Sequence, residues 1–186
     1  MIPQNGIESA PTDLIVWALV SHIRQSLGVG TAEVIHTIHD IKATASGGTL
    51  STALTLLDSY SLVQFARASA PWAMSDVTPP KESYSRPLLE RLSGIRVEPD
   101  LGGPLTDSIQ GPTDIPIIQR TWSLIDGGKY YGPKFHMTAY MRASSYLTAL
   151  ALHFAIMFGF LALALPPIRW VLKKYVYQPG EGPTKK

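Results

Sequence analysis

A short glycine loop, Ser46-Gly47-Gly48-Thr49, is the segment of the chain whose residue types best suit chemistry. It follows a stretch with strand character and precedes a stretch with helical spacing. In that position its backbone N–H groups and the helix dipole can receive an anionic or carbonyl oxygen. The same residues also suit a tight turn in which Thr49 caps the helix, and the sequence leaves both interpretations open.

Polar side chains on two predicted strands are the next candidates. His36, His39 and Asp40 together have the composition of a metal site. Residues three apart on a strand point to opposite faces, so the two imidazoles are not expected to share an ion. His136 and Tyr140 suit either a pocket wall or simple packing. No metal site is therefore expected, and the sequence assigns no catalytic residue.

Several classes of chemistry are excluded by composition and spacing. The chain has no cysteine, which rules out disulfides, thiol catalysis and cysteine-bound metals. Gly28-Val29-Gly30 begins like a dinucleotide fingerprint, but Glu33 occupies the place of the third glycine, and the pair precedes a strand instead of following one. No cofactor-binding residue is therefore expected. Ser9, Ser46 and Ser61 lack a recognisable triad, and a net charge of +2 does not suggest a nucleic-acid surface.

The elements that must position these residues predict an α+β fold. We expect a helix that Thr12 or Asp13 caps and Gly28 ends. A strand over 33–42, a helical stretch to about Ala68 with a break near 59–61, a helix from Asp114 and a strand over 135–141 follow. The first helix is expected to bury one apolar face, formed by Ile15, Val16, Leu19, Val20, Ile23 and Leu27. These elements predict a partial mixed sheet with flanking helices in residues 1–142.

Residues 76–116 differ in amino-acid composition from the rest of this region. Seven of the fifteen prolines lie between Pro79 and Pro116. Proline removes a backbone donor and interrupts both helices and ladders. The segment is therefore predicted to be irregular, with one short edge strand at Ile95 to Val97.

A single hydrophobic membrane helix is predicted from Tyr146 to Leu165, because these twenty residues include no Asp, Glu, Lys or Arg. At 1.5 Å per residue they cover about 30 Å, the thickness of a bilayer's hydrocarbon core. His153 lies inside this helix and is either functional or merely tolerated. The pattern also fits a buried core helix or an anchor in one leaflet, which the proline pair after the helix favours.

Basic and aromatic residues flank the hydrophobic helix. Arg142 precedes it, and residues 166–186 form a basic tail in which Arg169, Trp170, Lys173 and Lys174 resemble an interfacial belt. These five residues are the predicted anchor flank. If the helix spans, the positive tail is expected in the cytosol.

Three separated segments carry a family resemblance. They are the opening motif Pro3-Gln4-Asn5-Gly6-Ile7-Glu8-Ser9-Ala10-Pro11-Thr12-Asp13, the glycine loop at 46–49, and a closing region from Tyr131-Gly132-Pro133 to Tyr177-Gln178-Pro179-Gly180-Glu181-Gly182-Pro183. In this order they resemble saccharopine dehydrogenase-like oxidoreductases, most of all the fungal members. The resemblance covers almost the whole chain and implies that the N-terminal Rossmann domain, which holds NAD(P) in that family, is missing here.

The resemblance implies a C-terminal portion of a membrane-associated oxidoreductase of lipid or glycolipid metabolism, inactive without its cofactor domain. Related proteins act as enoyl reductases. It also implies a substrate cleft lined by two loops, whose members are Asn5, Gly6, Glu8, Ser9, Ser46, Gly47, Gly48 and Thr49. The alternative is a non-enzymatic single-pass adaptor or a subunit that pairs with another protein, so whether the chain is an enzyme is left open.

The expected partners are membrane lipid and either a Rossmann-domain protein or a second copy, with no nucleic acid and no metal. The expected location is a lipid-droplet, endoplasmic-reticulum or mitochondrial membrane, with the soluble part facing the cytosol.

Overall fold

The computed structural model describes residues 9–40, 47–79 and 86–176, with the backbone alone for 47–50 and 176. The helices are α1 (Ala10–Leu27), α2 (Gly47–Ser59), α3 (Leu62–Ala68), α4 (Leu88–Ser93), α5 (Gly111–Leu124), α6 (Tyr146–Leu163) and α7 (Pro166–Val171), and the strands are β1 (Glu33–Ile38), β2 (Ile95–Glu98), β3 (Gly103–Asp107) and β4 (His136–Arg142). Short 3-10 turns at Pro99–Leu101 and Asp126–Gly128 and a π-helical turn at Leu172–Val176 complete the described chain.

The four strands form one mixed sheet in the order β1-β4-β3-β2. β1 pairs with β4 in parallel, and the other two pairs are antiparallel. The register places Glu33 opposite His136 and Asp107 opposite Tyr140. The predicted fold class, a mixed sheet with flanking helices and one apolar helix, is therefore confirmed.

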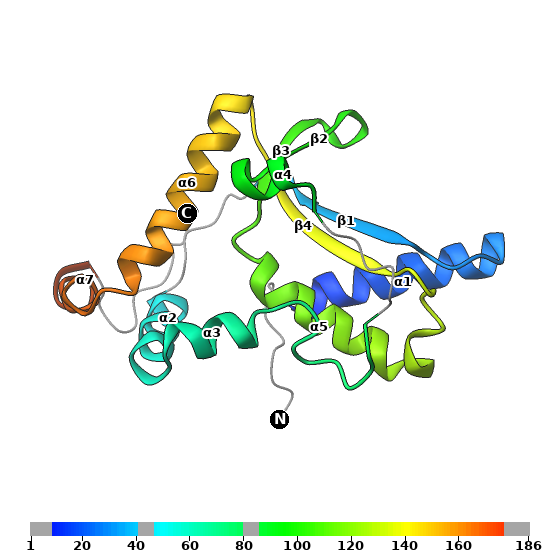
Figure 1. The fold of residues 1–186 in the computed structure, drawn as a ribbon, viewed down its shortest axis with the longest axis horizontal. Helices are drawn as coiled ribbons and strands as arrows, with labels where there is room; N and C mark the ends of the chain where they lie inside the picture. The colour runs from blue at the N-terminus through cyan, green and yellow to red at the C-terminus, as the bar shows by residue number, and fades with distance from the viewer. Residues whose placement is uncertain (1–8, 41–46, 80–85, 177–186) are drawn as a thin grey trace, which may run out of the picture.

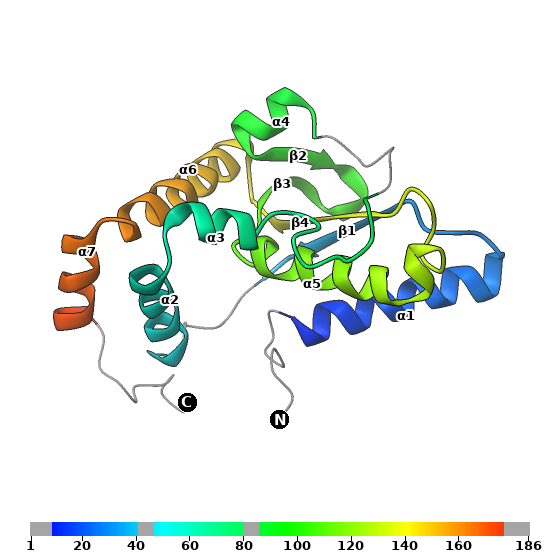
Figure 2. The ribbon, with the colours of Figure 1, turned by 60° about the horizontal axis from the view of Figure 1, so that its bottom comes forward.

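Helices α1 and α5 cover one face of the sheet (Figures 1 and 2). Side chains alternate along β4, so Met137 joins the core on this face while Tyr140 points to the other. The buried core consists of Val16, Val20, Val34, Ile118, Trp122, Tyr131, Phe135 and Met137. This face carries most of the hydrophobic packing, and the opposite face is left for polar groups.

Two polar residues at the start of α1 join this helix to α5. Thr12 donates to the buried Asp114 at 3.1 Å, and Thr121 donates to Asp13 at 2.7 Å. α1 begins at Ala10, with Ser9 at its N-cap position, and α5 begins at Gly111. The predicted caps at Thr12, Asp13 and Asp114 are therefore wrong, because these side chains bond across the helix pair.

The apolar face predicted for α1 is only partly correct. Val16 and Val20 are buried, but Ile15, Leu19 and Leu27 are exposed. Apolar residues lie on several sides of this helix, so their spacing alone does not identify the side that packs on α5.

The proline-rich segment is more regular than predicted. It contains α4, β2, β3 and the first residues of α5. β2 extends the predicted edge strand by one residue, but β3 was not expected, because it opens with Gly103 and Pro104, two residues that are rare in strands. Pro104 is opposite Val97 at the side of the sheet where β2 is the edge strand.

The remaining predicted elements are close to the observed ones. β1 ends at Ile38, shorter than predicted, and β4 covers His136–Arg142. The predicted break in the central helical stretch is confirmed by a capping box, in which Ser61 and Gln64 bond each other's backbone N–H at 2.9 and 3.3 Å.

Helix α6 leaves the sheet beside β3 and leads to α7, which lies next to α2 (Figures 1 and 2). Pro166 stands in the first turn of α7, where proline is tolerated, so the chain turns at this point and a new short helix starts. α6 and α7 together form an arm at one side of the sheet.

Candidate functional site

A polar network lies on the sheet face opposite to α1 and α5. Its centre is Tyr140, a residue that is only 1% exposed. The Tyr140 hydroxyl donates a hydrogen bond to the Glu90 carboxylate at 2.5 Å. Arg86 binds Glu90 at 2.9 Å and Asp107 at 2.7 Å, and its guanidinium lies 5.2 Å from the Tyr140 ring centre. The network therefore joins α4 to β3 and β4.

A second guanidinium extends the network toward β1. Arg96 lies 2.6 Å from Glu33 and 2.7 Å from Glu98, and it approaches the Tyr140 ring at 5.8 Å. His136 Nε2 lies 3.4 Å from the same Glu33 carboxylate. Four carboxylates thus surround two arginines, so each guanidinium already has two anionic partners.

The helix α6 is bound to this network through His153. Its Nδ1 lies 3.0 Å from Asp107 Oδ2, and its ring packs on Gly94, where an added Cβ would come within 2.0 Å of Nδ1. Gly94 ends α4 in the left-handed conformation, with φ of 66°. One turn earlier, the Thr106 hydroxyl donates to the carbonyl of Ala149 at 3.0 Å. His153 therefore anchors the helix to the domain.

The electrostatics of the network favour a structural role. Burial raises the pKa of Tyr140, and the hydrogen bond to Glu90 raises it further. Burial opposes ionisation of Glu33, but the hydrogen bond and charge of Arg96 leave its pKa lowered overall. A phenol with a raised pKa is a weaker proton donor than an ordinary tyrosine, and the arginines are already neutralised. The network therefore positions α4, β2 and α6.

Most of the predicted cleft residues lie outside the described part of the chain. This holds for Asn5, Gly6, Glu8 and Ser46. Ser9 is buried at the N-cap of α1, and residues 47–49 form the first turn of α2, for which only the backbone is described. Residues 47–49 therefore belong to the helix itself and do not form a loop before it. A cleft between the two predicted loops remains a prediction.

The glycine pair near the end of α1 has structural roles. Gly28 ends the helix in the left-handed conformation, with its N–H bonded to the Arg24 carbonyl. Gly30 packs against the backbone of Gly132, where an added Cβ would lie 3.0 Å from the neighbouring Cα. In the part of the chain that the structure describes, these residues do not fit a dinucleotide cradle.

The candidate metal residues lie apart from one another along the fold. His36 is on β1, where burial lowers its pKa, and His39 follows the end of the strand. Among residues 9–40, 47–79 and 86–176, no three His, Asp or Glu side chains are grouped so as to hold a metal ion. His136 and Tyr140, for which the sequence allowed a pocket, belong to the polar network.

A shallow hollow of about 260 Å³ opens near the end of α5. Its lining residues are Val77, Thr78, Trp122, Gly127, Gly128, Lys129 and Pro133. Ligand pockets usually enclose about 300–1,000 Å³. The hollow is smaller than that and open, so we assign no ligand to it.

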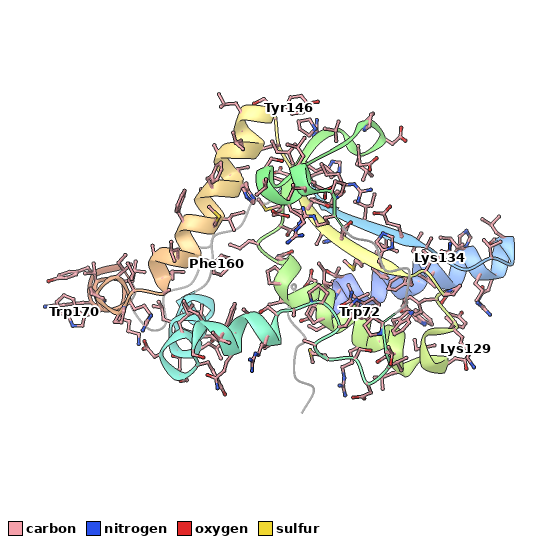
Figure 3. The ribbon with its side chains drawn as sticks, in the orientation of Figure 1. Trp72, Lys129, Lys134, Tyr146, Phe160 and Trp170 are labelled. Carbon is pink, nitrogen blue, oxygen red and sulfur yellow. The ribbon has the colours of Figure 1, made fainter. Side chains whose placement is uncertain are left out.

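The arm exposes many apolar side chains, among them Leu147, Phe158 and Leu161. α6 is the one described helix that is long and apolar enough to cross a membrane, with a mean hydropathy of 2.0 over 18 residues of which 6% are buried. A single such helix supports membrane association only weakly. Figure 3 shows Tyr146 and Phe160 on α6 and Trp170 on α7, along this arm.

The predicted flank residues have different environments. Arg142 is exposed at the end of β4 and its side chain covers Gly102. Trp170 is 57% exposed, and Lys174 lies 4.7 Å from its ring centre. Arg169 is only 12% exposed, because it binds Asp58 of α2 at 2.6 Å.

Arg169 also donates to the carbonyls of Leu163 and Ala164, at 3.0 and 2.7 Å. Lys173 binds the same Asp58 carboxylate. Two of the predicted flank cations therefore attach the end of the arm to α2, a contact that the sequence did not suggest.

Two curated proteins of Mycobacterium tuberculosis, one from strain H37Rv and one from strain CDC 1551, resemble this chain. Each is named a "putative trans-acting enoyl reductase". Each is 31% identical to this chain over an alignment 194 residues long, which covers 96% of this chain and 45% of the relative. The chain thus spans about half the length of the curated relatives it matches. No protein-family description and no solved structure matches it.

These relatives correct the assignment made from the sequence. Their names indicate enoyl reductases, and not saccharopine dehydrogenase-like oxidoreductases of lipid or glycolipid metabolism. The motifs at residues 3–13 and 46–49 are short and rich in Gly, Pro and Ser, which recur wherever turns are needed. Such segments identify a family less securely than a similarity over 96% of the chain.

Proposed function

We propose that this chain is a membrane-associated portion of an enoyl reductase. The observation that carries the proposal is its similarity, over 96% of its length, to proteins named as enoyl reductases. The exposed apolar helix α6 supports the membrane association. As the sequence predicts, we place the protein on the cytosolic side of a lipid-droplet, endoplasmic-reticulum or mitochondrial membrane.

Reduction of an enoyl group adds a hydride to the β-carbon and a proton to the α-carbon of an unsaturated acyl compound. The hydride requires a donor such as a nicotinamide nucleotide. Gly28 and Gly30, the pair that begins like a dinucleotide fingerprint, close a helix and pack on backbone instead of forming a phosphate cradle. We therefore propose that the hydride donor binds to residues other than those described, either elsewhere in a longer protein or on a partner.

The substrate side of the reaction is the part proposed for this chain. The relatives are about twice as long as the matched region, so the chain corresponds to one portion of such an enzyme. The two predicted loops, at residues 5–9 and 46–49, remain the proposed lining of the acyl site.

Two calorimetric titrations of the purified chain test this division. We expect a trans-2-enoyl thioester of N-acetylcysteamine to bind, and NADPH to show no binding at micromolar concentrations. Binding of NADPH would contradict the proposed division. Failure of the thioester to bind would remove the substrate-side role. The saturated acyl thioester, which has the same carrier group, is the control for specificity toward the double bond.

A further inference from the structure

We propose that the arm docks on a membrane by lying in the plane of one leaflet, with the outer side of α6 in lipid, and does not span the bilayer. This inference rests on the proposed membrane association and adds its topology. A spanning helix requires its two ends to lie on opposite sides of about 30 Å of hydrocarbon. The contacts at the two ends of α6 show whether this is possible.

The first half of α6 is attached to the sheet. The Ala149 carbonyl accepts the Thr106 hydroxyl at 3.0 Å, and His153 binds the Asp107 carboxylate at 3.0 Å. Both partners lie on β3, where Thr106 is buried and Asp107 is partly buried. If α6 spanned a bilayer, the Asp107 carboxylate and the residues around it would enter the hydrocarbon with the helix, which is costly for ionised groups.

The far end of the arm is attached to the same domain. Arg169 and Lys173 both bind Asp58 at the end of α2. The helices α2 and α3 lead to Trp72, whose backbone N–H binds Gln119 of α5 at 2.6 Å and whose ring packs edge-on against the core residue Trp122. Both ends of the arm therefore lie on one side of any bilayer that it meets.

The exposed side of α6 forms a continuous apolar stripe. Leu147, Phe154, Phe158 and Leu161 follow one another at intervals of seven, four and three residues within α6, so they share one helix face. All four are exposed, from 37% for Phe154 to 77% for Leu147. This spacing gives a flat strip along the length of the arm.

The opposite side of α6 faces the domain. Ala149 is fully buried, and Leu152, His153 and Ile156 are half-buried. This side carries His153, the one residue of α6 that belongs to the set His, Asp, Glu, Lys and Arg, and its ring is paired with Asp107. The exposed stripe therefore meets its surroundings without any charged or strongly polar side chain.

The residues after the arm's turn identify lipid as the occupant. Trp170 and Tyr175 are 57% and 68% exposed, and Lys174 lies over both rings, at 4.7 and 5.2 Å. Aromatic rings with a neighbouring cation prefer the headgroup region of a bilayer, and the ammonium complements anionic lipid. A contact between two protein copies gives no comparable reason for this combination.

The test uses the complete chain and its lack of cysteine. Two variants each carry a single cysteine: Ser144→Cys, before α6, and Thr184→Cys, in the tail. Each variant is mixed with sealed phosphatidylcholine–phosphatidylserine vesicles, separated by flotation and treated with a membrane-impermeant maleimide. We expect the protein to float and both sites to react fully before detergent is added. If one site reacts only after detergent, the helix spans and the proposed topology is wrong.

The stripe itself is tested by the pair Phe158→Asp and Leu161→Asp in one protein. A carboxylate costs several kcal/mol in the apolar region, so we expect vesicle binding to weaken about tenfold or more. A protein with Leu14→Asp and Leu27→Asp, at two exposed leucines of α1, gains the same charge, is the matched control and should leave binding unchanged. If the unmodified chain stays with the soluble fraction or forms a dimer that excludes vesicles, membrane docking fails, whereas the thioester titration judges the enoyl reductase proposal separately.

Discussion

Replacing Gly94 with alanine should loosen α6 from the domain. Gly94 ends α4 with φ of 66° and ψ of 14°, and Gly28 ends α1 with φ of 68° and ψ of 14°. Their backbone conformations are thus nearly the same. Their surroundings differ, because a Cβ on Gly94 would lie 2.0 Å from His153 Nδ1, and a Cβ on Gly28 would meet nothing within 4 Å.

The expected magnitudes follow from this difference. An alanine forced into the left-handed region costs about 1–2 kcal/mol, which is the whole expected effect of Gly28→Ala. In Gly94→Ala the His153 ring must also move, and its hydrogen bond to Asp107 is lost. A hydrogen bond to a charged group contributes about 1.5–3 kcal/mol, so Gly94→Ala should cost about 2.5–5 kcal/mol in total.

Urea unfolding in a mild detergent, followed by tryptophan fluorescence, measures both variants. The decisive comparison repeats them in a His153→Ala background, where the ring is absent. There Gly94→Ala should cost no more than Gly28→Ala. If Gly94→Ala keeps its larger cost without the ring, the contact with His153 is not what makes the glycine necessary.

Three further predictions concern titration. Burial raises the pKa of Asp13, so ionisation of this carboxyl opposes folding, and the stability of the protein should fall as the pH rises above about 4. In urea titrations Asp13→Asn should be more stable than the unmodified protein at pH 7 and should lose this advantage in acid. Burial raises the pKa of Tyr131 and of Tyr140, so two of the eight tyrosines should stay protonated at pH about 11 when absorbance at about 295 nm is followed. Lys173 and Arg169 lower the pKa of Asp58, so the contribution of Asp58 to stability is present above about pH 4 and is lost as the pH falls through its lowered pKa. Asp58→Asn should therefore reduce the acid-induced loss of stability in urea titrations. The difference from the unmodified protein should shrink in high salt.

The sequence was most informative where one local pattern was sufficient. The charge-free run predicted α6, and the β-branched stretch after Gly30 predicted β1. It was least informative where the partner lay far away in the chain. Thr12 has the residue type of a helix cap, but its hydroxyl binds Asp114, 102 residues later. No local signal distinguishes a cap from such a bond.

The polar network could not be predicted from the sequence, for the same reason. Tyr140 and Glu90 are 50 residues apart, and the proline-rich segment that supplies Glu90 was predicted to be irregular. In the sequence, Arg86 and Glu90 on either side of Pro87 resemble an exposed charged loop as much as part of a network. Only the pairing of β3 with β4 and the packing of α4 bring these charges together.

Hydropathy could not distinguish the two membrane topologies either, because it records composition and not attachment. A helix that lies in a membrane surface usually has a strongly polar face, because that face meets water. In α6 the side opposite the stripe meets the domain, so it can be apolar as well. The contacts that decide the topology join His153 to a residue 46 positions away and Arg169 to one 111 positions away. An apolar helix held at both ends by one domain has only its outer side available for lipid, whatever its length.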